Sequence, residues 1–156
     1  MSTTAGSVID AVMAALAGIN GAGSYANNLS GAGAVVEGDP PDQSVVLSTV
    51  CAFVDTGDLL AEHAPELGRY RRNLAVQVYG FVPAAADTPT SRKRAALSLL
   101  DDICRAMEAD RSLGGLVIDL TVQGRAFTGS GWGASSIGVA FAEIQAYWWV
   151  DAQEGV

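Results

Sequence analysis

Residues 99–124, LLDDICRAMEADRSLGGLVIDLTVQG, pass from a helical pattern to a strand pattern with no separate linker. Apolar residues before the change recur at alternating spacings of three and four, as on one face of a helix: Ala95, Ala96, Leu99, Leu100, Ile103, Cys104 and Met107. After the change, apolar and polar residues alternate, with Leu116, Ile118, Leu120 and Val122 on one face and Asp119, Thr121, Gln123 and Arg125 on the other. Gly114 and Gly115 permit the positive φ that ends a helix abruptly. We therefore expect a helix that packs on a sheet and leads directly into one of its strands.

Two helices are predicted. Apolar spacing indicates the first at 8–18, where Ser7 and Asp10 resemble a capping box. The second begins with Thr88 as N-cap and Pro89 at the first helical position, and runs to about residue 109.

Further strands are predicted from apolar and β-branched segments at 34–38, 45–54, 73–82 and 137–150. The final strand and the strand that begins near Leu116 are expected to form an antiparallel hairpin. The sequence thus predicts a single α+β domain, residues 1–156, with a mainly antiparallel mixed sheet of about four to five strands and two helices packed on one face. The connections near 20–33 and 55–72 are expected to be flexible.

Composition favours a folded chain in a reducing compartment. Of the 156 residues, 49% are hydrophobic, which is enough to build a core. Nothing resembles a secretory signal, and no window reaches the ~18 uncharged apolar residues of a membrane span. Cys51 and Cys104 fall at apolar positions of predicted elements, so we expect reduced core thiols and a cytoplasmic location.

The net charge of −8 is distributed unevenly. Residues 1–68 contain eight acidic residues and no Lys or Arg, whereas all nine basic residues lie within 69–125, beside six acidic ones. This polarity disfavours general binding to duplex DNA, which requires many neutralised phosphates. It suits a surface that meets an oppositely charged neighbour, such as another copy of the chain.

No catalytic, cofactor-binding or metal-ligating residue is predicted. His63 is the only histidine, which excludes a site that needs several imidazoles. No serine or cysteine lies in a recognisable nucleophile motif. Asp101 and Asp102 fall on the polar side of the second helix, at the spacing of ordinary surface ion pairs with Arg105.

Two features suggest contacts with another protein. The run Arg92–Arg94 places three cations in the first turn of a helix, where they oppose its dipole, so it is either a solvated face or a contact with an acidic neighbour. The final strand is substantially apolar on both faces. Either the sheet is covered on both sides near Tyr147 to Val150, or these aromatic residues lie in a subunit contact.

In this order, the segments VVLSTVCAFVDTG, RYRRNLAVQVYGFVP and AALSLLDDICRAMEADRSLGGLVIDL, with a closing hairpin that ends near YWW, cover most of the chain. The sequence resembles the tail terminator, or tail completion, proteins of long-tailed bacteriophages and phage-like particles. The helix that contains LLDDICRAM, followed closely by LGGLV, is the most characteristic part. The resemblance implies a mixed sheet flanked by helices.

The resemblance also implies a non-enzymatic virion protein that assembles as a hexameric ring. Such a ring caps the tail tube, stops its polymerisation and provides the head–tail joining surface. The implied partners are further copies of the chain, the tail tube protein and a head–tail connector or stopper protein. DNA would only pass through the bore, and an acidic ring would not retain it. The implied location is the head–tail junction of the virion, after assembly in the host cytoplasm, without membrane contact.

Charge and spacing, and no family motif, indicate the candidate contact residues. Subunit or tube contacts are predicted for Asp58, Glu62, Arg69, Arg71, Arg72, Arg92, Lys93 and Arg94. Bore-facing or solvated positions are predicted for Asp119, Gln123 and Glu143. Two alternatives remain open: another ring protein of the head–tail junction, such as a stopper or adaptor, and a small α+β enzyme or ligand-binding domain.

Overall fold

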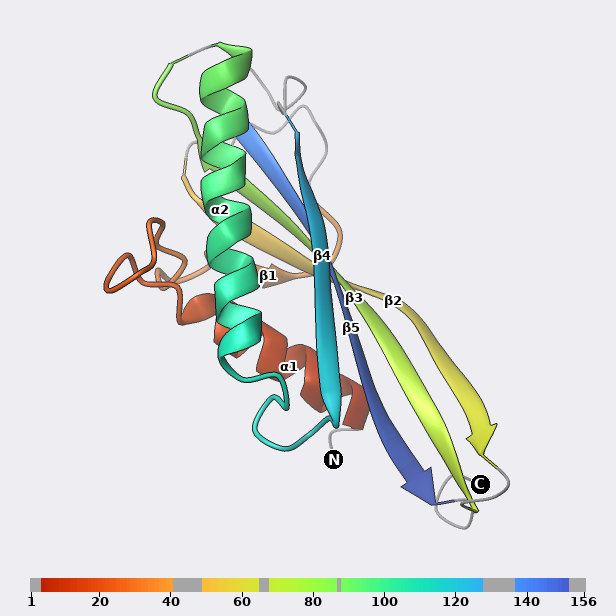
Figure 1. The fold of residues 1–156 in the computed structure, drawn as a ribbon. Coiled ribbons are helices and arrows are strands. Elements are labelled where there is room, and N and C mark those ends of the chain that lie inside the picture. Colours follow the sequence, from red (N-terminus) through yellow and green to blue (C-terminus); the bar gives the residue numbers. More distant parts are fainter. Residues whose placement is uncertain (1–3, 41–48, 65–67, 87, 128–136, 152–156) are drawn as a thin grey trace.

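The computed structural model describes residues 4–40, 49–64, 68–86, 88–127 and 137–151 (Figure 1). It confirms the α+β class. The elements are, in chain order, α1 (Thr4–Ala17), β1 (Val35–Glu37), β2 (Cys51–Ala64), β3 (Arg69–Pro83), α2 (Pro89–Ala109), β4 (Asp119–Phe127) and β5 (Ile137–Asp151). The five strands form one sheet in the order β1-β2-β3-β5-β4. β1 runs parallel to β2 and all other neighbours are antiparallel, so the predicted closing hairpin of β4 and β5 is confirmed.

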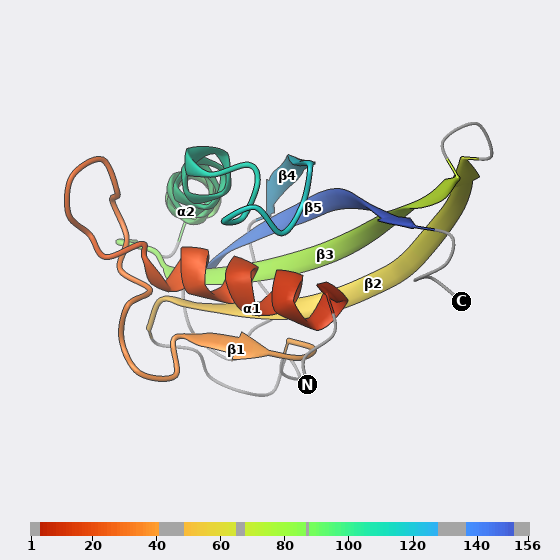
Figure 2. The same cartoon turned by 90° about the horizontal axis from the view of Figure 1, so that it is seen from below.

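Both helices lie on the same side of the sheet (Figure 2). α2 packs on β5, β4 and β3, whereas α1 packs on α2 and on the β1–β2 edge. Val12 and Leu16 of α1 and Leu99, Ile103 and Met107 of α2 are fully buried in this layer. The apolar stripe predicted for the second helix therefore forms the centre of the core.

The ends of the helices agree with the sequence in part. Thr88 caps α2 by accepting a hydrogen bond from Ser91 N at 3.1 Å, with Pro89 at the first helical position, as predicted. α1, in contrast, begins at Thr4, so Ser7 lies inside the helix and the predicted capping box is wrong.

The direct passage from helix to strand is also wrong. α2 ends at Ala109 and β4 begins only at Asp119. Asp110 organises the intervening turn by accepting hydrogen bonds from Ser112 and Gly114 N, and Gly114 and Gly115 have the expected positive φ of 71° and 90°. Because this turn breaks the strand alternation, Leu116 and Ile118 are exposed instead of buried.

The predicted connection at 55–72 is wrong as well, because residues 55–64 belong to β2 and residues 69–72 to β3, in the outer part of the hairpin that these strands form. The register pairs Leu60 with Asn73 and Glu62 with Arg71, and it is offset by a bulge between Thr56 and Leu59. Backbone pairing needs no apolar alternation, and the bulge shifts the faces on which successive side chains lie, so the sequence pattern concealed the outer parts of both strands. We call residues 59–64, 69–74 and 146–151 the arm. The far ends of these segments extend beyond both helices, whereas Leu74, Ala146 and Trp148 at their base still belong to the buried core (Figures 1 and 2).

Candidate interaction surfaces

No described helix lies on the second side of the sheet, which we call the helix-free face. Strand register determines which residues occupy it, because side chains alternate and directly paired residues share a face. Tyr79 is paired with Phe141, and Gln77 with Glu143, whereas their chain neighbours Val78 and Ala142 are buried towards the helices. The helix-free face consequently carries three zones along its strands: an aromatic zone, a polar row and the arm.

The aromatic zone lies where β2 begins and β3 ends. Cys51, Phe81, Ile137 and Val139 form a small second core. The Phe53 and Phe81 rings meet edge to face with centroids 5.7 Å apart. The sequence left open whether both sides of the sheet are covered near Tyr147. In the structure, side chains are buried on both sides at the other end of β5, where Ile137, Val139 and Ala140 lie. Cys51, buried here, and the half-buried Cys104 of α2 are both free thiols, and burial raises the pKa of each.

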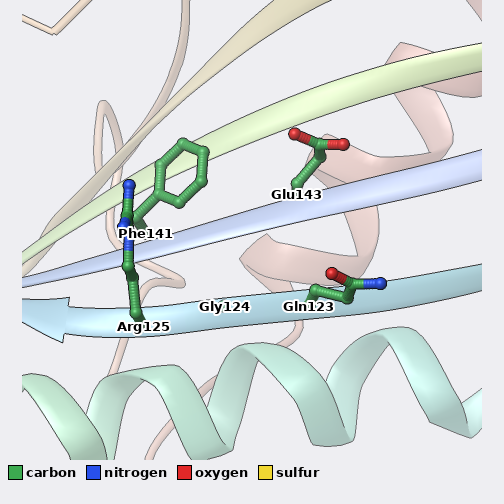
Figure 3. A pocket seen from close by; sticks show the side chains of 5 residues that line it. All are labelled: Gln123, Gly124, Arg125, Phe141 and Glu143. Carbon is green, nitrogen blue, oxygen red and sulfur yellow. The ribbon is translucent and has the colours of Figure 1, made fainter.

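The polar row crosses the middle of the sheet. Register places Asp55, Gln77, Glu143 and Gln123 side by side on successive strands. Glu143 also accepts a hydrogen bond from Gln145 at 2.8 Å. A shallow hollow of about 190 Å³ opens here, lined by Gln123, Gly124, Arg125, Phe141 and Glu143 (Figure 3). The structure thus brings together Gln123 and Glu143 of the predicted bore-facing set.

Asp119, the third residue of that set, is engaged elsewhere. Arg111 Nε and Nη2 donate to its two carboxylate oxygens at 2.8 and 3.0 Å. This fork-shaped pair at the start of β4 lowers the pKa of Asp119, with help from the Leu120 N–H. Asp119 therefore fixes the entry to β4.

The arm carries a ladder of cations and aromatic rings on the helix-free face. The guanidinium of Arg69 lies 4.4 Å from the centroid of the Trp149 ring, and that of Arg71 lies 4.3 Å from the Tyr147 centroid. Arg71 Nε also donates to Asn73 Oδ1 at 3.0 Å. Stacking holds each guanidinium by its flat face and leaves N–H groups along its edges to bind an acceptor.

The other predicted contact residues in and next to the arm do not share one face. Arg72 faces the helix side, where it lines a hollow of about 640 Å³ with Thr4, Ile118 and Trp148. Glu62 is exposed and is paired with Arg71 across the hairpin. The side chain of Asp58 lies outside the described residues.

The run Arg92–Arg94 does not form a single patch. Lys93 Nζ donates to the backbone oxygen of Ala126 at 2.8 Å, which ties α2 to the end of β4. Arg92 is half-buried against β5. Arg94 is exposed and lines two shallow hollows of about 590 and 550 Å³ beside Thr90. Of these three cations, Arg94 is therefore the one best placed to contact a partner.

Sequence reasoning placed Asp102 on the surface, but it is only 1% exposed. Its carboxylate accepts hydrogen bonds from Ala26 N, Asn27 N and Asn27 Nδ2 at 2.8–3.2 Å. Arg105 Nη1 lies 3.7 Å from Asp102 Oδ1 and donates a hydrogen bond to Ser24 O at 2.7 Å. Its Nη2 forms an ion pair with Oδ2 of the exposed Asp101 at 3.3 Å. The loop that was predicted near 20–33 is therefore anchored to α2.

Sequence reasoning also missed an acidic pair beside the edge strand β1. The carboxyl groups of Asp39 and Asp55 share a hydrogen bond, which together with their charge repulsion raises the pKa of Asp39. No local pattern joins these residues, because Asp39 follows β1 and Asp55 lies on β2, and the two strands pair only in the folded sheet.

Comparison with protein-family models and with curated proteins finds no match to this chain. No helix in the described part of the chain is both long and apolar enough to cross a membrane. Within the same ranges, no three His, Cys, Asp or Glu side chains are grouped as metal ligands would be.

Proposed function

We propose that this chain is a structural protein of a bacteriophage or phage-like tail. In this proposal, copies of the chain form a ring that caps the tail tube, stops tube polymerisation and provides the surface for head–tail joining. The observation that carries the proposal is the one-sided architecture. Both helices cover one face of the sheet, so the other face and the arm offer broad protein-contact surfaces.

The order of elements supports the proposal, because a mixed sheet flanked by helices is the fold that the sequence resemblance implies. The arm adds further support. Its stacked cations, Arg69 and Arg71, lie on the same face as the exposed Leu60, and such a mixture of apolar and cationic groups is typical of protein interfaces. The polar row around Gln123 and Glu143 would suit a surface past which DNA moves without being held.

The test is electron microscopy of particles assembled after the gene is deleted from the phage or phage-like element that encodes it. We expect full heads that are separated from abnormally long tubes, and normal particles after complementation with the wild-type chain. Tails of normal length beside heads that leak DNA would instead assign the chain to a stopper or adaptor ring. Intact infectious particles would contradict a structural role.

A second measurement isolates the capping step. Purified tail tube protein is allowed to polymerise with and without the chain, and tube lengths are measured from micrographs. We expect the chain to shorten the tubes in proportion to its concentration and to be located at one tube end. Unchanged tube lengths would contradict termination even if the chain forms rings.

A further inference from the structure

We propose that the cation–aromatic ladder of the arm, formed by Arg69, Arg71, Tyr147 and Trp149, docks on the acidic β1 edge of a second copy of this chain. We define that edge by Glu37, Asp39 and Asp55. The inference rests on the proposed function, since it names the partner and the two surfaces through which the ring closes.

The two stacked guanidinium groups of the ladder can bind carboxylates of a partner. Stacking on Trp149 and Tyr147 restricts Arg69 and Arg71 before any partner arrives, which reduces the entropy lost on binding. None of the carboxylates whose side chains the structure describes forms an ion pair with either arginine. Leu60 is 62% exposed and is paired with Asn73 on the same face, so it adds an apolar contact next to the cations.

The carboxyl groups of the acidic edge can bind cations of a partner. Glu37 is exposed on the outermost strand, where it is paired with Val54 and so lies on the helix side of the edge. Asp39 is exposed just after that strand, beside Asp55 of β2. The hydrogen-bonded pair of carboxyl groups is disfavoured when both are charged, and the raised pKa of Asp39 reflects this. Residues 1–68 contain no Lys or Arg, so the cation must come from another part of a chain. Val36, 38% exposed, supplies an apolar neighbour for Leu60.

The two surfaces cannot satisfy each other within one molecule. Asp55 is paired with Gln77, whereas Arg71, the nearer cation of the ladder, lies six residues before Gln77 on β3. At about 3.3 Å per residue, this separates the surfaces by roughly 20 Å, which exceeds the Debye length of about 8 Å at physiological salt. The complementarity is therefore available only between copies.

Such a contact joins two different surfaces, so it is head-to-tail. Head-to-tail contacts generate closed rings when the rotation between copies closes. The inferred contact thus provides the geometry that a ring requires.

The first test is self-association of the full chain, measured by sedimentation and light scattering at low salt. The charge-reversed variant Arg69→Glu/Arg71→Glu should self-associate at least about tenfold more weakly than wild type. Arg125→Glu is the matched control, because Arg125 lies on the same face and stacks on Phe127 at 5.0 Å, but belongs to β4 outside the arm. Unaltered association of the arm variant, or equal loss in the control, would overturn the inference.

Restoration of the contact gives the second test. Glu37→Lys/Asp39→Lys should also fail to associate alone. A 1:1 mixture of the two variants should assemble, because each reversed arm then faces a reversed edge and copies can alternate around an even-numbered ring. Folded variants that remain separate when mixed would overturn the proposed pairing. Circular dichroism and thermal unfolding establish that each variant is folded.

The wild-type chain provides a measurement that needs no variant. Raising the salt from about 0.05 to 0.5 M should weaken its association, because screening acts on exposed charges. Association that salt leaves unchanged, or a chain that is monomeric at low salt, would overturn the inference.

The tube-length assay separates the two proposals. If an arm variant still assembles and shortens the tubes normally, the proposed docking is wrong but the proposed capping function stands. If the wild-type chain forms salt-sensitive rings that do not shorten the tubes, the docking stands but the capping function is wrong.

Discussion

At the scale of single residues, Asp102 shows the limit of local pattern. The sequence correctly paired Arg105 with Asp101, since their spacing of four residues on one helix is a local property. Nothing local distinguishes Asp102, whose partners Ala26 and Asn27 lie about 75 residues earlier in the chain. A buried carboxylate is costly unless it is hydrogen-bonded, and here the loop backbone supplies those bonds. Asp102 consequently sets the conformation of a loop that the sequence indicated only as a glycine-rich connection.

The two neighbouring acids give a matched pair of variants. Asp102→Ala leaves the N–H groups of Ala26 and Asn27 without their acceptor, so we expect a loss of about 2–3 kcal/mol in the free energy of unfolding. Asp101→Ala removes only an exposed ion pair, since Asp101 is 71% exposed, and should cost less than about 1 kcal/mol. Urea unfolding measures both values, and hydrogen exchange at residues 26 and 27 should accelerate only in Asp102→Ala. Equal costs for the two variants would contradict the anchoring role.

At the scale of elements, the sequence predicted the helices and strands that have a regular apolar pattern and clear end signals. α2 has an N-cap, a proline and a continuous apolar stripe, and its predicted bounds agree with the structure. The last strand was predicted closely because its apolar residues persist over its whole length. The parts of the arm at 59–64 and 69–72 were missed because they have polar residues on both faces, a bulge at their base and stability from pairing with β5, which lies about 80 residues away in sequence.

The contact between α2 and β5 makes an element-scale prediction. A Cβ added at Gly138 would collide with the backbone oxygen of Arg92 and would lie 2.7 Å from Ala96 N, so helix and strand would have to separate. We expect Gly138→Ala to lower the free energy of unfolding by about 1–3 kcal/mol.

Gly80→Ala is the control for this close approach. A Cβ at Gly80 would meet the tip of the Leu99 side chain at 2.7 Å, and that tip can change its rotamer more easily than a backbone can move. The cost of Gly80→Ala should therefore be smaller in the same thermal or urea unfolding experiment. A larger cost at Gly80 would show that side-chain packing, and not backbone approach, limits this interface.

At the scale of the whole molecule, the charge division was visible in the sequence but its placement was not. The acid-only first 68 residues and the cationic middle of the chain can be counted directly. Only the register of β2 and β3 shows that Asp55 and Arg71 lie on one face of the same hairpin, with Asp55 in its middle and Arg71 near its turn. Strand pairing thus converts a difference in composition along the chain into two separated surfaces of opposite charge.

These surfaces make assembly sensitive to pH in a defined direction. In the isolated chain, the carboxyl group of Asp55 raises the pKa of Asp39 above its ordinary value of 3.8. The guanidinium groups of a neighbouring arm would favour the charged form and lower that pKa, so assembly releases a proton. Self-association should therefore be weakest in acid, strengthen as the pH rises through the raised pKa, and then level off. Each unit of difference between the two pKa values corresponds to about a tenfold change in the association constant per contact.

Sedimentation at constant ionic strength, from acid to neutral pH, measures this dependence. Asp39→Asn is the appropriate control, because asparagine can keep a hydrogen bond to Asp55 but does not titrate. We expect this variant to associate more weakly than wild type at neutral pH and to lose the part of the pH dependence that the shared proton causes. The arm variant Arg69→Glu/Arg71→Glu should lose the same part, because the cations that lower the pKa of Asp39 are then absent. If wild-type association is instead strongest in acid, the carboxyl pair does not receive the arm, and the ring must close through other surfaces.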